Sequence, residues 1–382
     1  MVAIDQSSRV LLFARASDDD DSCARPTTDD NGAVLSIGIT THTLLKILSA
    51  VFLGLTVLNS IIHITRHLSR YTAPIQQRQI IRIILVPTVF AILSFLSVLF
   101  YQASIYLRPV AEIYESIAIP AIFILYIHYV FPGPGSHSWR ELFYRLEDPY
   151  SREASIAGGD VTWFKRTCVL VFQYVRYNQS FIALANNVDR YPISKTASSI
   201  VEIATQGAGV YCVNSLAPGH AHLWCEIINV VSIVLAVPHV IRFERRLKEH
   251  IDPKHKPGVK LWTFKGFVFL QFVQLILFGL LNGRLSNPTA SITFNDLYYG
   301  IPATLTCIEA WIFTIIFMWS FSTKEYAPKN IDGQCNRMPI WRALLDSLNI
   351  SDLVGAIATL IRILMEGNWQ PVREDQNGDE RK

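Results

Sequence analysis

Residues 83–107 read IILVPTVFAILSFLSVLFYQASIYL, a run of 25 residues without Asp, Glu, Lys or Arg. A helix needs about 20 mostly apolar residues to cross a membrane, so this stretch predicts a membrane span. Over the whole chain 51% of residues are hydrophobic and 17% are charged, whereas a soluble domain has about a quarter charged. The sequence therefore predicts an all-α polytopic membrane protein, a bundle of seven transmembrane helices. The predicted spans are 43–64, 83–107, 109–131, 167–186, 223–241, 261–281 and 297–321.

Lysine and arginine are concentrated in two of the loops that join these spans. The first loop carries Arg66, Arg70 and Arg78, and the fifth, over 242–260, carries seven basic residues. The second loop carries only Arg108, and the fourth and sixth are similarly poor. Cytoplasmic loops retain Lys and Arg, so the odd loops are expected in the cytosol. This orientation leaves the N-terminus outside and the C-terminus in the cytosol.

The chain is polar at both ends. Residues 1–41, with four consecutive aspartates at 18–21, are expected to form a disordered acidic outer tail. Residues 42–326 form the predicted membrane domain and 327–382 a cytosolic tail. Apolar residues recur at helical intervals from Trp341 to Leu364. This pattern predicts an amphipathic helix over about 338–366, against the inner leaflet or under the bundle.

Five of the predicted spans contain ionisable residues, which cost roughly 2.5–3.5 kcal/mol each in hydrocarbon on insertion scales. Such residues are expected to face the bundle interior, a partner charge or water. Arg176 and Glu309 fall near the midplane and are candidates for an ion pair. Glu115 lies above them, and Gln271 and Gln274, one turn apart, are their expected neighbours. These five residues form the predicted substrate path, with a purely structural ion pair as the alternative.

Four further residues are secondary candidates. Glu112 is one turn from Glu115 and is expected to share its face toward an outer vestibule. Lys265 lies near the inner edge of the sixth span, where its stem can extend to water. Gln173 and Asn229 add polar side chains to the fourth and fifth spans.

No catalytic site, cofactor or metal centre is predicted, and the chain is not expected to be an enzyme. His63 and His67 would need a third histidine to hold a metal, and a basic helix end is the plainer interpretation. The six cysteines lack CxxC or metal-ligand spacing, and Cys212 and Cys225 are equally compatible with a disulfide or with free thiols. The net charge of +3 is spread among loops, which indicates no nucleic-acid partner.

The order of several short segments resembles the organic solute transporter alpha-subunit family, including its transmembrane protein 184 branch. The resemblance covers roughly 43–326 and 346–352. It is carried by QRQIIRI at 77–83, YES at 114–116, FQY at 172–174, IINVVS at 227–232, KGFVFL at 265–270, CIE at 307–309 and FSTKEY at 321–326.

The resemblance implies a seven-helix fold and facilitated passage of steroids, bile acids and related amphipathic anions, with a separate single-span beta subunit. Two departures separate this chain from the animal transporters. FPGPG at 131–135 replaces a cysteine-rich stretch, and RYN at 176–178 replaces a frequent Arg-Pro. The chain looks nearer to relatives tied to vacuolar or endosomal membranes and trafficking.

The predicted function is therefore facilitative transport or handling of amphipathic organic solutes or lipids, in the plasma membrane or in an endosomal or vacuolar membrane. The expected partners are membrane lipids, the solute, and either a beta-type subunit or further copies of the chain. One alternative is a trafficking scaffold. The other is a seven-helix receptor, which is disfavoured because the third span ends in YIHY at 126–129 and the seventh has no Asn-Pro-x-x-Tyr.

Overall fold

The computed structural model describes residues 33–131 apart from 37, and 194–211, 218–282, 292–327, 330–331, 334–335 and 338–349. It also describes scattered positions between 142 and 171, and residues 351, 352 and 355. Most of the predicted fourth span and of both tails therefore lies outside the described residues.

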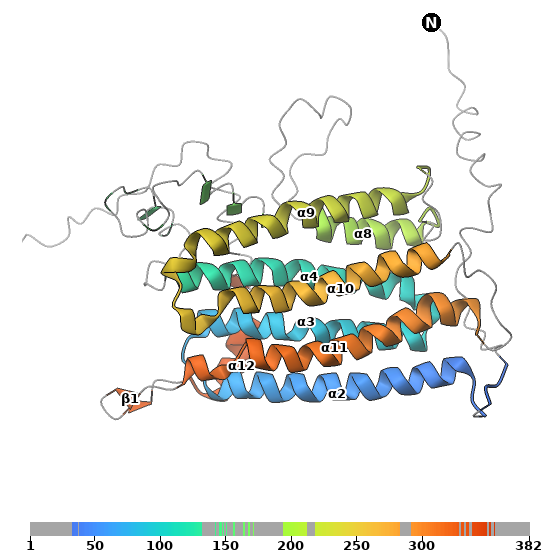
Figure 1. Cartoon of the computed structure of the whole chain (residues 1–382), viewed down its shortest axis with the longest axis horizontal. Coiled ribbons are helices and arrows are strands. Elements are labelled where there is room, and N and C mark those ends of the chain that lie inside the picture. Colours follow the sequence, from blue (N-terminus) through green and yellow to red (C-terminus); the bar gives the residue numbers. More distant parts are fainter. Residues whose placement is uncertain are drawn as a thin grey trace, which may run out of the picture.

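Long helices with nearly parallel axes make up the molecule (Figure 1). They are α2 (Thr41–Ser69), α3 (Pro74–Leu99), α4 (Tyr101–Val130), α9 (Ala221–Leu247), α10 (Pro257–Asn282) and α11 (Ile301–Ser320), which follows a π-helical turn at Asp296–Gly300. Among the described residues, four segments are long and apolar enough to cross a membrane: α2, α3, α4 and Asp296–Tyr326. The all-helical membrane fold is confirmed at this level, whereas the count of seven and the orientation remain predictions.

The shorter elements lie around these helices. α8 (Ser194–Gly207) packs on α4 and α9, and α12 (Ile340–Leu348) packs on α2 and α3. Two-residue strands β1 (Asn330–Ile331) and β2 (Gln334–Cys335) pair antiparallel. Short 3-10 turns occur at Lys248–His250, Pro253–His255 and Thr323–Tyr326. We call the end where α2 stops and α3 starts the inner end, because the sequence predicts that it faces the cytosol.

The apolar side chains divide between an interior and an outward surface. Ile83, Phe123 and Phe267 belong to one buried cluster that joins α3, α4, α10 and α11. On α2, a stripe at helical spacing is exposed instead, and it consists of Val51, Leu55, Leu58 and Ile62. A large exposed apolar surface on a helix of this length is expected to face lipid.

The predicted boundary between the second and third spans is wrong. The sequence ran the second span to 107, but α3 ends at Leu99 and α4 begins at Tyr101. Arg108 is therefore inside α4 and not in a loop. The break at Phe100 is stabilised from other helices. His42 on α2 hydrogen-bonds to the Val98 carbonyl oxygen at 2.8 Å.

The π-helical turn supports the same break. The hydroxyl of Tyr101 donates to Asp296 at 2.7 Å. The turn approaches closely because Gly300 has no side chain: a Cβ there would lie 2.5 Å from the Tyr101 hydroxyl oxygen and 2.7 Å from Leu45 Cδ1.

Gln77 organises the turn between α2 and α3. Its side-chain oxygen accepts from the backbone N–H groups of Thr72 (2.8 Å) and Ala73 (3.0 Å). Its amide nitrogen donates to the carbonyl oxygens of His67 (3.2 Å) and Arg70 (2.9 Å). One buried side chain thus satisfies backbone groups that both helix termini leave without partners. This gives a structural role to the first residue of the QRQIIRI segment.

Candidate functional site

A polar ladder joins α10 to α11 in the middle of the bundle. The amide nitrogen of Gln271 donates to Glu309 Oε2 at 2.8 Å, and Thr306 donates to the Gln271 side-chain oxygen at 3.0 Å. Gln274 donates to the Pro302 carbonyl oxygen at 2.7 Å. Glu309 is only 8% exposed. The structure therefore brings three of the predicted path residues, Gln271, Gln274 and Glu309, into one hydrogen-bonded row.

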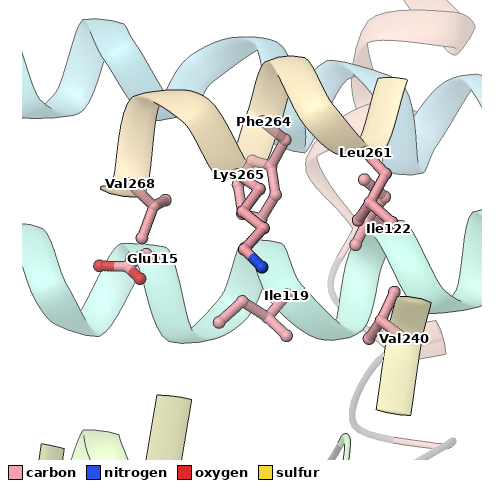
Figure 2. Close-up of a pocket in the computed structure, with 8 residues that line it drawn as sticks. All are labelled: Glu115, Ile119, Ile122, Val240, Leu261, Phe264, Lys265 and Val268. Atoms are coloured by element: carbon pink, nitrogen blue, oxygen red, sulfur yellow. The ribbon is translucent and has the colours of Figure 1, made fainter. Parts of the chain in front are cut away.

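Glu115 lies elsewhere, on the surface of α4 that faces α10. It lines a cavity with Lys265, and between the two the walls are apolar, as Figure 2 shows. The apolar lining comprises Ile119, Ile122, Val240, Leu261, Phe264 and Val268. Lys265, a secondary candidate near the inner edge of its predicted span, contributes its side chain to the wall of this cavity. The surface of the cavity is therefore apolar, and two of the residues that line it, Glu115 and Lys265, carry a carboxylate and an amine.

The volume of this cavity limits what it can hold in this conformation. It is about 30 Å³, which is room for one or two water molecules. A pocket for an organic ligand is usually about 300–1,000 Å³. A steroid-sized solute therefore requires α10 to move away from α4.

Glu112 does not share the cavity with Glu115. It faces Arg108 at 3.4 Å, and Arg108 also lies 3.9 Å from Glu226. Glu202 on α8 and Tyr211, which follows α8, also belong to this outer cluster. The Tyr211 hydroxyl donates a hydrogen bond to Glu202 at 2.6 Å. Burial, followed by the charge of Glu112, raises the pKa of Glu202 to about 7.

Glu202 and Tyr211 were not among the residues predicted from the sequence. The amphipathic pattern of 194–207 was the available signal, but it lies in a segment interpreted as an outer loop. Two other predicted residues, Gln173 and Arg176, lie outside the described residues, so the proposed Arg176–Glu309 ion pair stays a prediction. Asn229 is in α9, and its side chain also lies outside the described residues.

A second polar network, which was not predicted from the sequence, lies at the inner end of the bundle. Lys260 on α10 is fully buried, and its amine lies 2.8 Å from Glu325 and 2.9 Å from the Tyr129 hydroxyl of α4. His255 contacts Glu325 at 2.9 Å, and the hydroxyls of Tyr129 and Tyr326 are 3.2 Å apart. From the sequence, Lys260 was interpreted only as one of the basic residues of the fifth loop. Its burial depends on contacts with α4 and with the turn after α11.

His63 and His67 are held by the same turn. The Nε2 atom of each lies 2.9 Å from the Phe321 carbonyl oxygen, at the end of α11. This is a helix-terminus contact. These hydrogen bonds give the two histidines a structural role. Within the part of the chain that the structure describes, no group of three potential metal ligands occurs.

Comparison with known proteins gives consistent results. The chain is 25% identical to the vacuole membrane protein hfl11 of Schizosaccharomyces pombe over 305 residues, which are 79% of this chain and 67% of that protein. It is 24% identical to a transmembrane protein 184 homolog of Dictyostelium discoideum over 274 residues, 71% of this chain and 51% of the relative. The chain thus spans about half to two thirds of these relatives. No solved structure matches.

The family comparison covers the whole described bundle. The model of the family described as Organic solute transporter Ostalpha matches residues 45–326, which run from the first turns of α2 to the turn after α11. Glu115, Lys265, Gln271, Gln274 and Glu309 all fall inside that range. The chain belongs to the organic solute transporter Ostalpha family, a family of membrane transporters.

Proposed function

We propose that the protein is a facilitative carrier for amphipathic organic solutes such as steroid-like or bile-acid-like anions or lipids. The observation that carries this proposal is the composition of the cavity between α4 and α10. An amphipathic anion would set its charge against Lys265 and its apolar body against Ile119, Phe264 and Val268. Apolar walls with a few placed polar groups are typical of small-molecule sites.

The polar contacts of α10 indicate how this cavity would open. α10 is hydrogen-bonded to α11 through Gln271 and Gln274, so the two helices would move together. At the inner end, α4 is connected to this pair by Tyr126, which donates to the Pro257 carbonyl oxygen at 2.7 Å, and by Tyr129. We infer that these tyrosines act as a cytosolic gate. Lys260 and Glu325 stay together on the moving side.

Uptake of a radiolabelled sulfated steroid into proteoliposomes tests the carrier. Lys265→Gln and Glu309→Gln are expected to reduce the initial rate by roughly tenfold or more, because the first removes the positive charge beside the cavity and the second replaces the carboxylate that accepts from Gln271 in the row between α10 and α11. Lys248→Gln, the same change at an exposed lysine of the α9–α10 link, is the matched control and is expected to leave uptake unchanged. Wild-type uptake in both test variants, at equal protein levels and stability, would remove the proposed path.

The proposed gate can be tested separately in the same uptake assay. Tyr126→Phe deletes one hydrogen bond worth about 0.5–1.5 kcal/mol and keeps the ring in place. A weaker closed state should raise the uptake rate while lowering thermal stability slightly. A slower rate with normal stability would show instead that Tyr126 serves the solute directly.

A second candidate function is a trafficking scaffold at a vacuolar or endosomal membrane; the fission-yeast relative is named a vacuole membrane protein, which supports the location. The two functions separate in cells that lack the protein. If Glu309→Gln abolishes uptake by liposomes yet restores a trafficking defect fully, the scaffold role is supported. The proposed organisation retains seven spans, an outer N-terminus, and either a beta-type subunit or a second copy as partner.

A further inference from the structure

The helix α12 is amphipathic, but its polar side faces the protein. Ala343 belongs to a small buried cluster with Leu68, Tyr71 and Ile81 at the inner ends of α2 and α3. Ser347, one turn later, is also buried. The backbone N–H of Met338, just before the helix, donates to the Tyr71 carbonyl oxygen at 3.1 Å.

Two carboxylates fix this orientation. Asp346 pairs with Arg78 and accepts from the Tyr71 hydroxyl at 2.7 Å. Asp352, just beyond the helix, lies 2.6 Å from the Arg82 guanidinium. Burial opposes ionisation of Asp352, but hydrogen bonds and charge from Arg82 outweigh it and lower the pKa of Asp352 below its usual range. The carboxylate is therefore ionised at neutral pH, and the contact persists there.

The opposite side of α12 is apolar and uncovered among the described residues. Trp341 is 60% exposed and Leu345 62% exposed, whereas Ala343 is fully buried. The exposed set is Ile340, Trp341, Leu344, Leu345 and Leu348. This face lies within the nine residues of α12, about two and a half turns, whereas a stable protein interface involves roughly 20–30 residues a side.

The register of α2 and α3 gives the depth of α12. Ser60 and Thr88 hydrogen-bond at 2.6 Å, so they lie at one level. Six residues toward the inner end, about 9 Å along each helix, stand Arg66 on α2 and Arg82 on α3. The exposed apolar stripe of α2 ends at Ile62, just before that level. The exposed Arg66 thus follows directly after the apolar stripe of α2, and the buried Arg82, which pairs with Asp352, lies at the same level.

We propose that α12 is an in-plane membrane helix, whose apolar face lies in the leaflet at the inner end while Asp346 and Asp352 hold its polar side to α3. Amphipathic helices of this kind lie about 5–10 Å deep at the boundary between headgroups and acyl chains. Arg78 is one turn beyond Arg82, so α12 is at this depth. Arg342, whose guanidinium is 4.9 Å from the Trp341 ring, is suited to headgroup phosphates.

Photocrosslinking in nanodiscs of phosphatidylcholine and phosphatidylserine tests the proposal. p-Benzoyl-phenylalanine is introduced separately at Leu345 and Leu348, and at the exposed Glu249 of the α9–α10 link as a control at the same end of the molecule. Irradiation should give lipid adducts, detected by mass spectrometry, at a yield roughly tenfold higher for the two α12 positions.

Two outcomes would overturn the inference. Equal, low adduct yields at all three positions would mean that the face is in water. Crosslinks between two protein chains at Leu345 would assign the face to a second copy. The measurement uses the intact chain and does not depend on solute transport, so it stands or falls separately from the proposed function.

Discussion

Lys260 is a buried cation whose removal has a calculable cost. In Lys260→Met, a side chain of similar length replaces the amine, and Glu325, itself largely buried, retains its contact with His255. Removing one partner of a buried ion pair costs about 3–5 kcal/mol, because a charge is left without compensation. We expect the lower part of this range, since His255 Nδ1 stays within hydrogen-bond distance of Glu325, at 2.9 Å.

An exposed ion pair in the same chain provides the control for this buried one. Lys254 and Asp252 form an ion pair at 2.7 Å, nearly the same distance, but both side chains are half exposed. An exposed pair contributes about 0–1 kcal/mol, so Lys254→Met should leave the stability almost unchanged. The assay is thermal unfolding in detergent, combined with a double variant, Lys260→Met with Glu325→Gln. The double variant should be more stable than Lys260→Met alone. Equal stability of Lys260→Met and Lys254→Met would refute the buried pair.

Two further predictions concern the outer half of the molecule. Gly300→Ala would force a Cβ against the Tyr101 hydroxyl and should cost about 1–3 kcal/mol of stability; Gly54→Ala, where the new Cβ has no neighbour within 4 Å, should be neutral or stabilising in the same unfolding measurement. The raised pKa of Glu202 means that the folded state retains a proton which the unfolded state releases, so stability should fall as the pH rises from about 4.5 to about 7 and then level off. Thermal unfolding across this range, compared with Glu202→Gln, checks the effect, and an identical pH dependence in both proteins would contradict it.

The sequence predicted the long apolar helices because membrane insertion depends on hydropathy, which is a local property. The end of α3 was misplaced because hydropathy is continuous through Phe100. The actual break depends on His42 and Asp296, which lie far away in the sequence and supply polar contacts to Val98 and Tyr101. No window of residues 83–107 contains that information.

The candidate site shows the same division. Spacing along one helix correctly indicates that Gln271 and Gln274 share a side of α10, and the structure adds Glu309 to that side. Spacing also indicated that Glu112 and Glu115 share a side, yet Glu112 lies with Arg108 while Glu115 lines the cavity. The difference arises because α4 has several neighbours: it packs on α8 and α9, and it shares the cavity with α10. Two residues one turn apart on α4, such as Glu112 and Glu115, can therefore contact different helices.

α10 contacts α11 and α4 through different kinds of interaction, and this difference bears on the proposed transport. Toward α11 it makes hydrogen bonds at a level that the sequence predicts to be mid-membrane, where water would not compete for them and where separating the two helices would take the Gln271 donor away from Glu309. Toward α4 it meets an apolar cavity, and the hydrogen bonds to Tyr126 and Tyr129 are at the inner end. Hydrogen bonds near the interface can be exchanged for water at low cost, whereas the mid-membrane ladder cannot. We therefore infer that the proposed carrier would open between α4 and α10, the surface that also carries Lys265.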